Sequence, residues 1–286
     1  MKKNIGIIIA SVMIVCLFAA AVSNVSRLNE SYAVPVSAGG RAEYVTLPII
    51  MYHSILAKTS DPGAYIVRTA QFENDLAYLK SAGYETVVFA DLLDYVNGGK
   101  LPEKPVMITF DDGQRNNLTY AVPLLEKYGY KAVFSVVGTY IEKAEKDESF
   151  PYMTWDDVKT AKQSGAVEIQ NHSYNLHGGS ARMGFRKQYG ETPASFHDSI
   201  FNDILKMQSL LMSRASVTST CFTYPYGYTF SGARQLLQDA GFQGSMTCIE
   251  RINYIPRERN ALFDLSRFNR SGKYTTEQFM KKIGVK

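Results

Sequence analysis

The chain has 286 residues, of which 45% are hydrophobic and 20% are charged, and its formal net charge is +4. This composition is typical of a globular protein, with room for one large domain or two small ones. The Lys and Arg residues are scattered rather than clustered, so the sequence carries no footprint of nucleic-acid binding. Cys221 and Cys248 could pair if their strands are neighbours, but the three cysteines do not show the spacing of a zinc knuckle.

Residues 1–23 predict a transmembrane anchor or a secretory signal. Lys2 and Lys3 precede an uncharged run, residues 5–22, which is about as long as a helix that crosses a bilayer. Small residues at the end of the run also fit a signal-peptide cleavage site, and we favour the uncleaved anchor. The early positive charge predicts that the rest of the chain lies outside the cytoplasm, either anchored at the extracellular face of the membrane or secreted.

A polar, mixed stretch, residues 24–45, predicts a linker, and residues 46–286 predict the folded domain. Within this domain, apolar strand patterns alternate with amphipathic helix patterns. The expected strands are 48–53, 85–89, 105–110, 131–137, 167–170, 220–225, 244–249 and 262–268. The expected helices are 69–83, 92–96, 118–128, 154–164, 195–214, 231–240 and one that begins near 275. This alternation predicts an α/β fold with a parallel sheet, and its size favours a closed or nearly closed barrel.

Two adjacent carboxylates follow the apolar strand expected at 105–110, in the sequence VMITFDDGQ. Asp111 and Asp112 come at its end, where α/β proteins place their chemistry. Like charges this close push their pKa values apart, which suggests that one Asp binds a cation while the other accepts a proton. A polar turn between strand and helix explains the tripeptide DDG equally well.

Two of the four histidines lie five residues apart after the strand at 167–170. With one carboxylate, His172 and His177 would form a two-His, one-Asp metal site that leaves positions open for water and substrate. Two histidines on a surface loop are the alternative. The metal site is favoured because the strand ends that carry DDG and HSYNLH converge in such a fold.

Three motifs in this order, TFDDG, NHSYNLH and FTYPYG, resemble those of the polysaccharide deacetylases of carbohydrate esterase family 4, which contain the NodB-homology domain. The resemblance runs from about Leu47 to the C-terminus. It implies a distorted (β/α)7 barrel of parallel strands, here preceded by the N-terminal hydrophobic helix. It also implies one divalent metal ion, with zinc as the first choice.

The resemblance also implies roles for single residues. Asp111 resembles the general base, and the metal ligands would be Asp112, His172 and His177. The backbone N–H of Tyr226 would face the oxyanion. The groove that binds the substrate would include Tyr224 and Pro225 of FTYPYG. Apart from the resemblance, the aromatic residue Tyr174 flanks the second motif and could line the same groove. In this chemistry the metal polarises the amide and activates a water, Asp111 takes the proton of the water, and acetate leaves.

The chain departs from the family pattern at two positions. Thr223 stands where many members have an Arg that orients the base; Arg267 could supply that charge and line the site, or could form a salt bridge at the barrel end. The usual acid, a His near the C-terminus, is missing because no histidine follows His197. The early Tyr-His pair in PIIMYHSI resembles a subset with permuted motifs that deacetylates poly-N-acetylglucosamine. In that arrangement His53 would be the acid.

The predicted function is therefore metal-dependent removal of N-acetyl groups from a cell-surface polysaccharide of poly-N-acetylglucosamine or peptidoglycan type. The expected partners are this acetylated polysaccharide and, through the N-terminal segment, the membrane, with no nucleic acid. Two alternatives stay open: a glycan-binding pseudoenzyme and an O-acetyl esterase on the same fold. The sequence does not distinguish N-acetyl from O-acetyl substrates.

Overall fold

The computed structural model describes residues 44–58, 62–178 and 182–286. The predicted anchor and nearly all of the predicted linker lie outside these described residues, so both stay predictions. Strand β1 (Tyr44–Leu47) begins two residues before the predicted domain boundary at 46. None of the helices in the described residues has the length and apolar character needed to span a bilayer.

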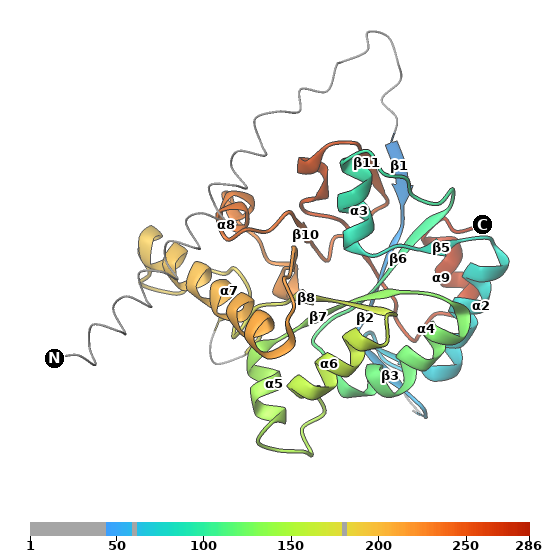
Figure 1. The fold of residues 1–286 in the computed structure, drawn as a ribbon, viewed down its shortest axis with the longest axis horizontal. Coiled ribbons are helices and arrows are strands. Elements are labelled where there is room, and N and C mark those ends of the chain that lie inside the picture. The colour runs from blue at the N-terminus through green and yellow to red at the C-terminus, as the bar shows by residue number, and fades with distance from the viewer. Residues whose placement is uncertain (1–43, 59–61, 179–181) are drawn as a thin grey trace, which may run out of the picture. The chain divides into compact units, whose positions relative to one another are not determined.

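A curled sheet of parallel strands forms the centre of the fold (Figure 1). Its strand order is β10-β9-β8-β7-β6-β2-β12, with β5 also paired to β6. The members are β2 (Ile49–Tyr52), β5 (Glu85–Thr86), β6 (Pro105–Phe110), β7 (Ala132–Val136), β8 (Val167–Asn171), β9 (Cys221–Thr223), β10 (Gly244–Met246) and β12 (Phe268–Asn269). All of these neighbours pair in parallel, which confirms the predicted α/β class.

One segment contacts both ends of this curled sheet. Leu265 pairs with Met246 of β10, and Phe268 pairs with Ile50 of β2. The segment 265–270, which contains the last strand of the sheet order, β12, therefore also contacts the first strand, β10, as a distorted barrel requires.

Eight α-helices accompany the sheet in the described residues (Figure 1). They are α2 (Thr69–Ser81), α3 (Phe89–Val96), α4 (Val122–Tyr128), α5 (Gly138–Ala144), α6 (Trp155–Gln163), α7 (Pro193–Ala215), α8 (Ala233–Asp239) and α9 (Thr276–Lys282). Threonine caps explain several starts: Thr154, Thr192 and Thr275 each accept a backbone N–H of the first turn. The helix expected to begin at residue 69 does so, with Thr69 as its first helical residue and Arg68 in the cap position.

Several short elements were missed or placed wrongly by the sequence patterns. The helix expected over 118–128 is divided into a π-helical turn, Asn117–Ala121, and α4. The strands expected over 85–89, 244–249 and 262–268 are only two or three residues long, and a 3-10 helix (Arg259–Leu262) precedes the last. The unexpected elements are α5 and the pairs β1–β11 (Asn253–Pro256) and β3 (Ser54–Leu56)–β4 (Ile66–Arg68).

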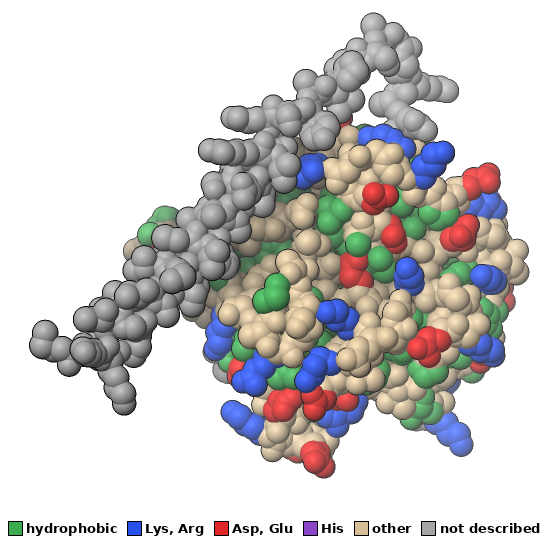
Figure 2. Space-filling view, viewed as in Figure 1, with side chains coloured by type: hydrophobic (Ala, Val, Ile, Leu, Met, Phe, Trp, Pro, Cys, Tyr) green, Lys and Arg blue, Asp and Glu red, His purple; other side chains and the backbone are tan. Residues whose placement is uncertain are grey.

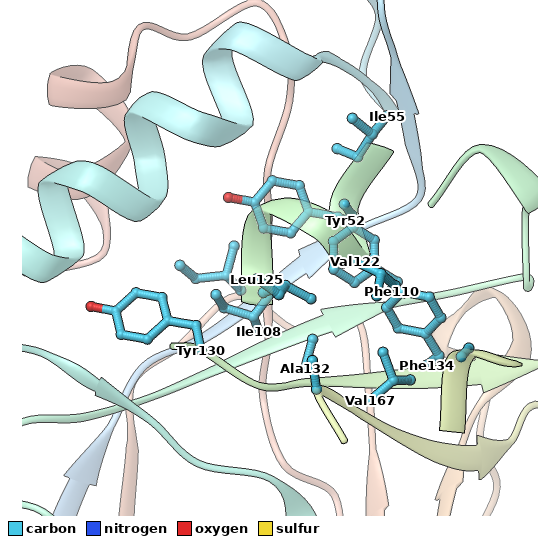
Figure 3. Packing of buried hydrophobic residues seen from close by; sticks show 14 of the residues in the cluster. Tyr52, Ile55, Ile108, Phe110, Val122, Leu125, Tyr130, Ala132, Phe134 and Val167 are labelled. Atoms are coloured by element: carbon cyan, nitrogen blue, oxygen red, sulfur yellow. The ribbon is translucent and has the colours of Figure 1, made fainter. Parts of the chain in front are cut away.

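Side-chain alternation along the strands separates two environments. One face of the sheet carries large apolar side chains that pack under the helices, with Tyr52, Ile108, Phe110 and Phe134 at the centre of this core (Figure 3). The opposite face carries apolar residues near the strand starts: Ile49, Met107, Val133 and Cys221. Further along the same face the residues become polar, namely Thr109, Ser135 and Thr223. Cys221 and Cys248 are both free thiols.

A buried ion pair fixes the C-terminal part of the chain to the helical layer. Arg270 donates to both carboxylate oxygens of Asp75 in α2, at 2.7 and 3.0 Å. The hydroxyls of Tyr52 and Thr276 donate to the same carboxylate at 2.9 and 2.6 Å. Both charged side chains are fully buried, so each depends on the other for compensation of its charge.

Replacing Asp75 by Ala should lower the free energy of unfolding by about 3–5 kcal/mol, because it leaves Arg270 buried without a counter-charge. The control is Asp156→Ala, which removes an exposed pair with Lys159 and should cost less than about 1 kcal/mol. Figure 2 shows acidic and basic side chains mixed on the surface of one face, where water screens such pairs. Urea unfolding of both variants measures the difference, and equal losses would contradict a stabilising role for the buried pair.

Candidate active site

Strand register brings the three motifs to one edge of the sheet. Tyr52 is level with Phe110, Val136 with Asn171, and Asn171 with Phe222. The residues that follow these positions, His53, Asp111, His172 and Thr223, therefore lie at neighbouring carboxyl ends, as the sequence predicted.

The backbone turns sharply at each motif. Asp112, Ser173 and Tyr226 have positive φ angles of 70°, 77° and 59°, in the left-handed region that L-residues usually avoid. Each of the three lies shortly after a strand, in a different motif. Such conformations cost of order 1–3 kcal/mol and persist where the surrounding structure holds them, which is a feature of functional sites. The turn at Asp112 frees its side chain from the strict alternation that places Asp111.

Three predicted ligands form a compact triangle. The distance from Asp112 Oδ1 to His177 Nε2 is 3.2 Å and to His172 Nε2 3.6 Å, and the two Nε2 atoms are 3.2 Å apart. A tetrahedral zinc ion with bonds of about 2.0–2.1 Å separates its ligand atoms by about 3.3 Å, so the triangle fits a single ion. Asp112 Oδ1 is buried and has no hydrogen-bond partner among the described residues, as expected of a metal ligand.

Surrounding groups orient the two imidazoles of the triangle. Nδ1 of His172 lies 2.7 Å from the carbonyl oxygen of Thr223 and donates to it, which leaves the Nε2 lone pair directed at the triangle. The hydroxyl of Tyr140 donates to the His177 carbonyl at 2.7 Å, and the Tyr226 ring packs on the His177 ring. Burial lowers the pKa of His172 to about 3, so this imidazole is neutral and able to bind a cation near neutral pH.

The two aspartates differ sharply in their environments. Burial opposes ionisation of Asp111, but two hydrogen bonds of 2.7 and 2.8 Å from the Arg267 guanidinium, together with its charge, hold the Asp111 pKa well below its usual range. Burial and the negative charge of Asp111 raise the pKa of Asp112 to about 6. Asp111 is therefore ionised and bound to a cationic partner, whereas Asp112 lacks one and faces the two imidazoles.

Arg267 takes the first of the two roles left open by the sequence, since it pairs with the predicted base. It also donates to the Thr247 carbonyl at 2.9 Å and to the Thr109 hydroxyl at 3.2 Å, and it is fully buried. The prediction that Arg267 binds substrate is wrong for this reason: all of its surface is covered by protein.

His53 lies on the same edge, directly after β2, as predicted. Its ring packs against the exposed ring of Tyr65 with 4.6 Å between centroids. Its Nδ1 is buried and has no hydrogen-bond partner in the described residues. Burial lowers the pKa of His53, and the charges of Asp111 and Asp112 act in the opposite direction.

Two of the predicted groove residues point elsewhere. Tyr224 is fully buried against Phe185 and Phe222, and its hydroxyl donates to Asp264. Alternation places Tyr224 on the opposite face from Thr223, so it cannot line the groove. The ring of Tyr174 lies under Lys206 and its hydroxyl donates to Glu142, which holds it between α5 and α7.

The turn that contains the last predicted groove residue, Pro225, reaches the metal triangle through its neighbour Tyr226. Pro225 is buried in a short 3-10 turn, Pro225–Gly227, and Tyr226 is 40% exposed next to His177. Sequence reasoning missed Tyr140, Tyr65 and the polar residues inside the sheet. A signal did exist for Thr109 and Ser135, because each interrupts an apolar strand at an inward-facing position.

The chain is similar to known proteins in both sequence and fold. The polysaccharide deacetylase family model matches residues 98–245. The chain is 28% identical over 239 residues to the poly-beta-1,6-N-acetyl-D-glucosamine N-deacetylase of Escherichia coli (strain K12), covering 73% of this chain and 35% of that protein. It is 24% identical over 200 residues to the enzyme of the same name from Staphylococcus aureus (strain MSSA476), covering 68% of this chain and 67% of that protein.

The structure of IcaB from Ammonifex degensii shares the fold, with a TM-score of 0.67 at 24% identity, covering 83% of this chain and 97% of that one. The chain spans about a third of the length of its Escherichia coli relative. The family match covers just over half of the 286 residues. The chain belongs to the polysaccharide deacetylase family.

Proposed function

We propose that the protein is a metal-dependent hydrolase that removes N-acetyl groups from a polysaccharide of N-acetylglucosamine at the cell surface. The observation that carries the proposal is the ionised Asp111, fixed by Arg267, beside the triangle of Asp112, His172 and His177. A glycan-binding pseudoenzyme would not need a base next to a metal site. The names of the relatives favour poly-β-1,6-N-acetylglucosamine over peptidoglycan as the substrate.

The donor set of two imidazoles and one carboxylate suits zinc. When bound, such an ion supplies a Lewis acid for the acetyl carbonyl and lowers the pKa of a coordinated water. Asp111 would accept the proton of the attacking water, and Arg267 would keep this carboxylate oriented and ionised. The backbone N–H of Tyr226 would stabilise the oxyanion.

His53 would complete the reaction by protonating the departing amine, so that the C–N bond breaks and the products are acetate and a free amine. An O-acetyl esterase could use the same residues, but an alkoxide leaves far more readily than the unprotonated nitrogen of an amide, so ester hydrolysis needs this proton less. The loss of rate on mutation of His53 should therefore be larger for N-acetyl than for O-acetyl hydrolysis, which distinguishes the two activities. We also propose that residues 1–23 hold the catalytic domain outside the cytoplasmic membrane.

The first test concerns the metal. The purified protein should bind about one zinc ion, and His172→Ala and His177→Ala should each lose most of it, whereas His197→Ala, which changes an exposed histidine, should not. Because Asp112 in the metal-free protein has a pKa of about 6, protons should displace the ion as the pH falls below that value. Zinc content after gel filtration at several pH values measures both effects. Unchanged zinc in both histidine variants would refute the assigned ligands.

The second test concerns turnover. The zinc-loaded protein should release acetate from poly-β-1,6-N-acetylglucosamine, and Asp111→Asn should lower this rate by about 10²–10⁴-fold while zinc stays bound, because it removes only the proton acceptor. Asp156→Asn, an exposed change on α6, is the matched control.

Arg267 loses its counter-charge in Asp111→Asn, so urea unfolding must show that the assayed variant is folded. Loss of zinc together with activity would make Asp111 a ligand. Absence of acetate release by the wild-type protein from this polymer, from chitin oligomers and from peptidoglycan would refute the deacetylase proposal itself.

The third test concerns the acid. His53→Ala should slow amide hydrolysis by roughly a hundredfold or more, with zinc content unchanged, because a poor leaving group loses its proton donor. Hydrolysis of an acetate ester should be slowed much less. Measuring the rates of amide and ester hydrolysis gives the fold-loss on each substrate in His53→Ala, and His197→Ala serves as the control. Full amide activity in His53→Ala would leave this histidine with a structural role only.

A further inference from the structure

The loop between the two histidine ligands is held by side chains at every backbone N–H. The N–H of Ser173 donates to Asn171 Oδ1 at 2.7 Å, and the N–H of Leu176 donates to Ser173 Oγ at 3.2 Å. The two between them, of Tyr174 and Asn175, donate to the two carboxylate oxygens of Asp203, both at 2.8 Å. Four consecutive N–H groups in residues 173–176 thus have side-chain acceptors, and one carboxylate from another element supplies half of them.

Asp203 occupies a rigid position. It lies near the middle of α7, a helix of 23 residues whose neighbouring side chains Ile204 and Met207 are fully buried. The same part of the helix contacts the strand end before the loop, since Asn171 Nδ2 donates to the Ile204 carbonyl at 3.4 Å and to Gln208 Oε1 at 3.3 Å. The helix therefore acts as the support on which the loop rests.

The two histidines depend on this support to different degrees. His172 follows β8 directly, its N–H donates to the Val136 carbonyl, and its Nδ1 is bonded to Thr223. His177 lies beyond the left-handed turn at Ser173, outside the named strands and helices, and is otherwise held by an isolated bridge to Met183 and by its contacts with Tyr140 and Tyr226. The loop 173–176 connects His177 to the strand end, and its two central N–H groups would lose a charged acceptor if Asp203 were changed.

We propose that Asp203 is a positioning residue that sets the metal affinity of the site, by holding the loop 173–176 and through it the ligand His177. The inference rests on the proposed function for the identity of the ligands. Groups that contact the metal ligands but not the metal, and so orient these ligands, typically change metal affinity by roughly 10–100-fold when they are mutated.

The test uses Asp203→Asn, with Asp198→Asn as the matched control, because Asp198 is an exposed aspartate of the same helix whose side-chain contact is with His197. Asparagine keeps one acceptor and turns an NH2 group toward the second N–H, so it removes one hydrogen bond without a large change of shape. Zinc affinity is measured by competition with a chromophoric chelator. Hydrogen exchange of the metal-free proteins is followed by mass spectrometry on peptides that span residues 171–178.

The dissociation constant for zinc should rise about tenfold or more in Asp203→Asn and stay unchanged in Asp198→Asn. Exchange of the amides of Tyr174 and Asn175 should accelerate at least about tenfold, with the change confined to this loop. An unchanged zinc affinity would overturn the proposal, as would faster exchange spread over the whole domain, which indicates general destabilisation. If the wild-type protein binds no zinc, the proposed function fails. Unchanged exchange of the loop amides in Asp203→Asn would independently refute the proposal that Asp203 holds the loop 173–176.

Discussion

The ion pair between Asp111 and Arg267 is the interaction on which the site depends. Two adjacent carboxylates in a buried position would repel each other, and burial alone would favour protonation of both. Arg267 resolves the conflict by binding both oxygens of Asp111, which stays ionised. Asp112, turned away by its left-handed backbone, has no such cation and faces two neutral imidazoles. The difference in partners gives the two carboxylates different chemistry.

The same segment that supplies Arg267 also holds the fold together. Residues 265–270 pair with β10 on one side and with β2 on the other. Alternation points Arg267 into the site and Arg270, three residues later, toward Asp75 and the helical layer. Each arginine is fully buried and each is compensated by one aspartate. The position of segment 265–270 therefore determines both the closure of the curled sheet and the assembly of the site. A shift of this segment would break the ion pairs of Arg267 with Asp111 and of Arg270 with Asp75.

Much of the site could be predicted from local patterns. Asp111, Asp112, His172 and His177 follow strands that the apolar runs reveal, and parallel strand ends converge. The predictions that were incomplete or wrong concern contacts between residues distant in the sequence, or the face of a short strand on which a side chain lies. The partner of Arg267 lies 156 positions away in the sequence, so the sequence could offer this pairing only as one of two alternatives. Tyr224 and Tyr174 sit beside the motifs, but alternation and the contacts with Glu142 and Lys206 turn them from the groove. Strands of two or three residues carry too little periodicity to be recognised.

The different roles of the two aspartates, with Asp112 as a metal ligand and Asp111 as the base, can be tested most directly by X-ray diffraction. The data are collected at the zinc absorption edge from crystals of the zinc-loaded protein. We predict a single anomalous peak at about 2.0–2.2 Å from Nε2 of both His172 and His177 and from a carboxylate oxygen of Asp112. Asp111 should remain paired with Arg267, outside the coordination sphere. A peak at bonding distance from Asp111, with Arg267 displaced from it, would contradict the account.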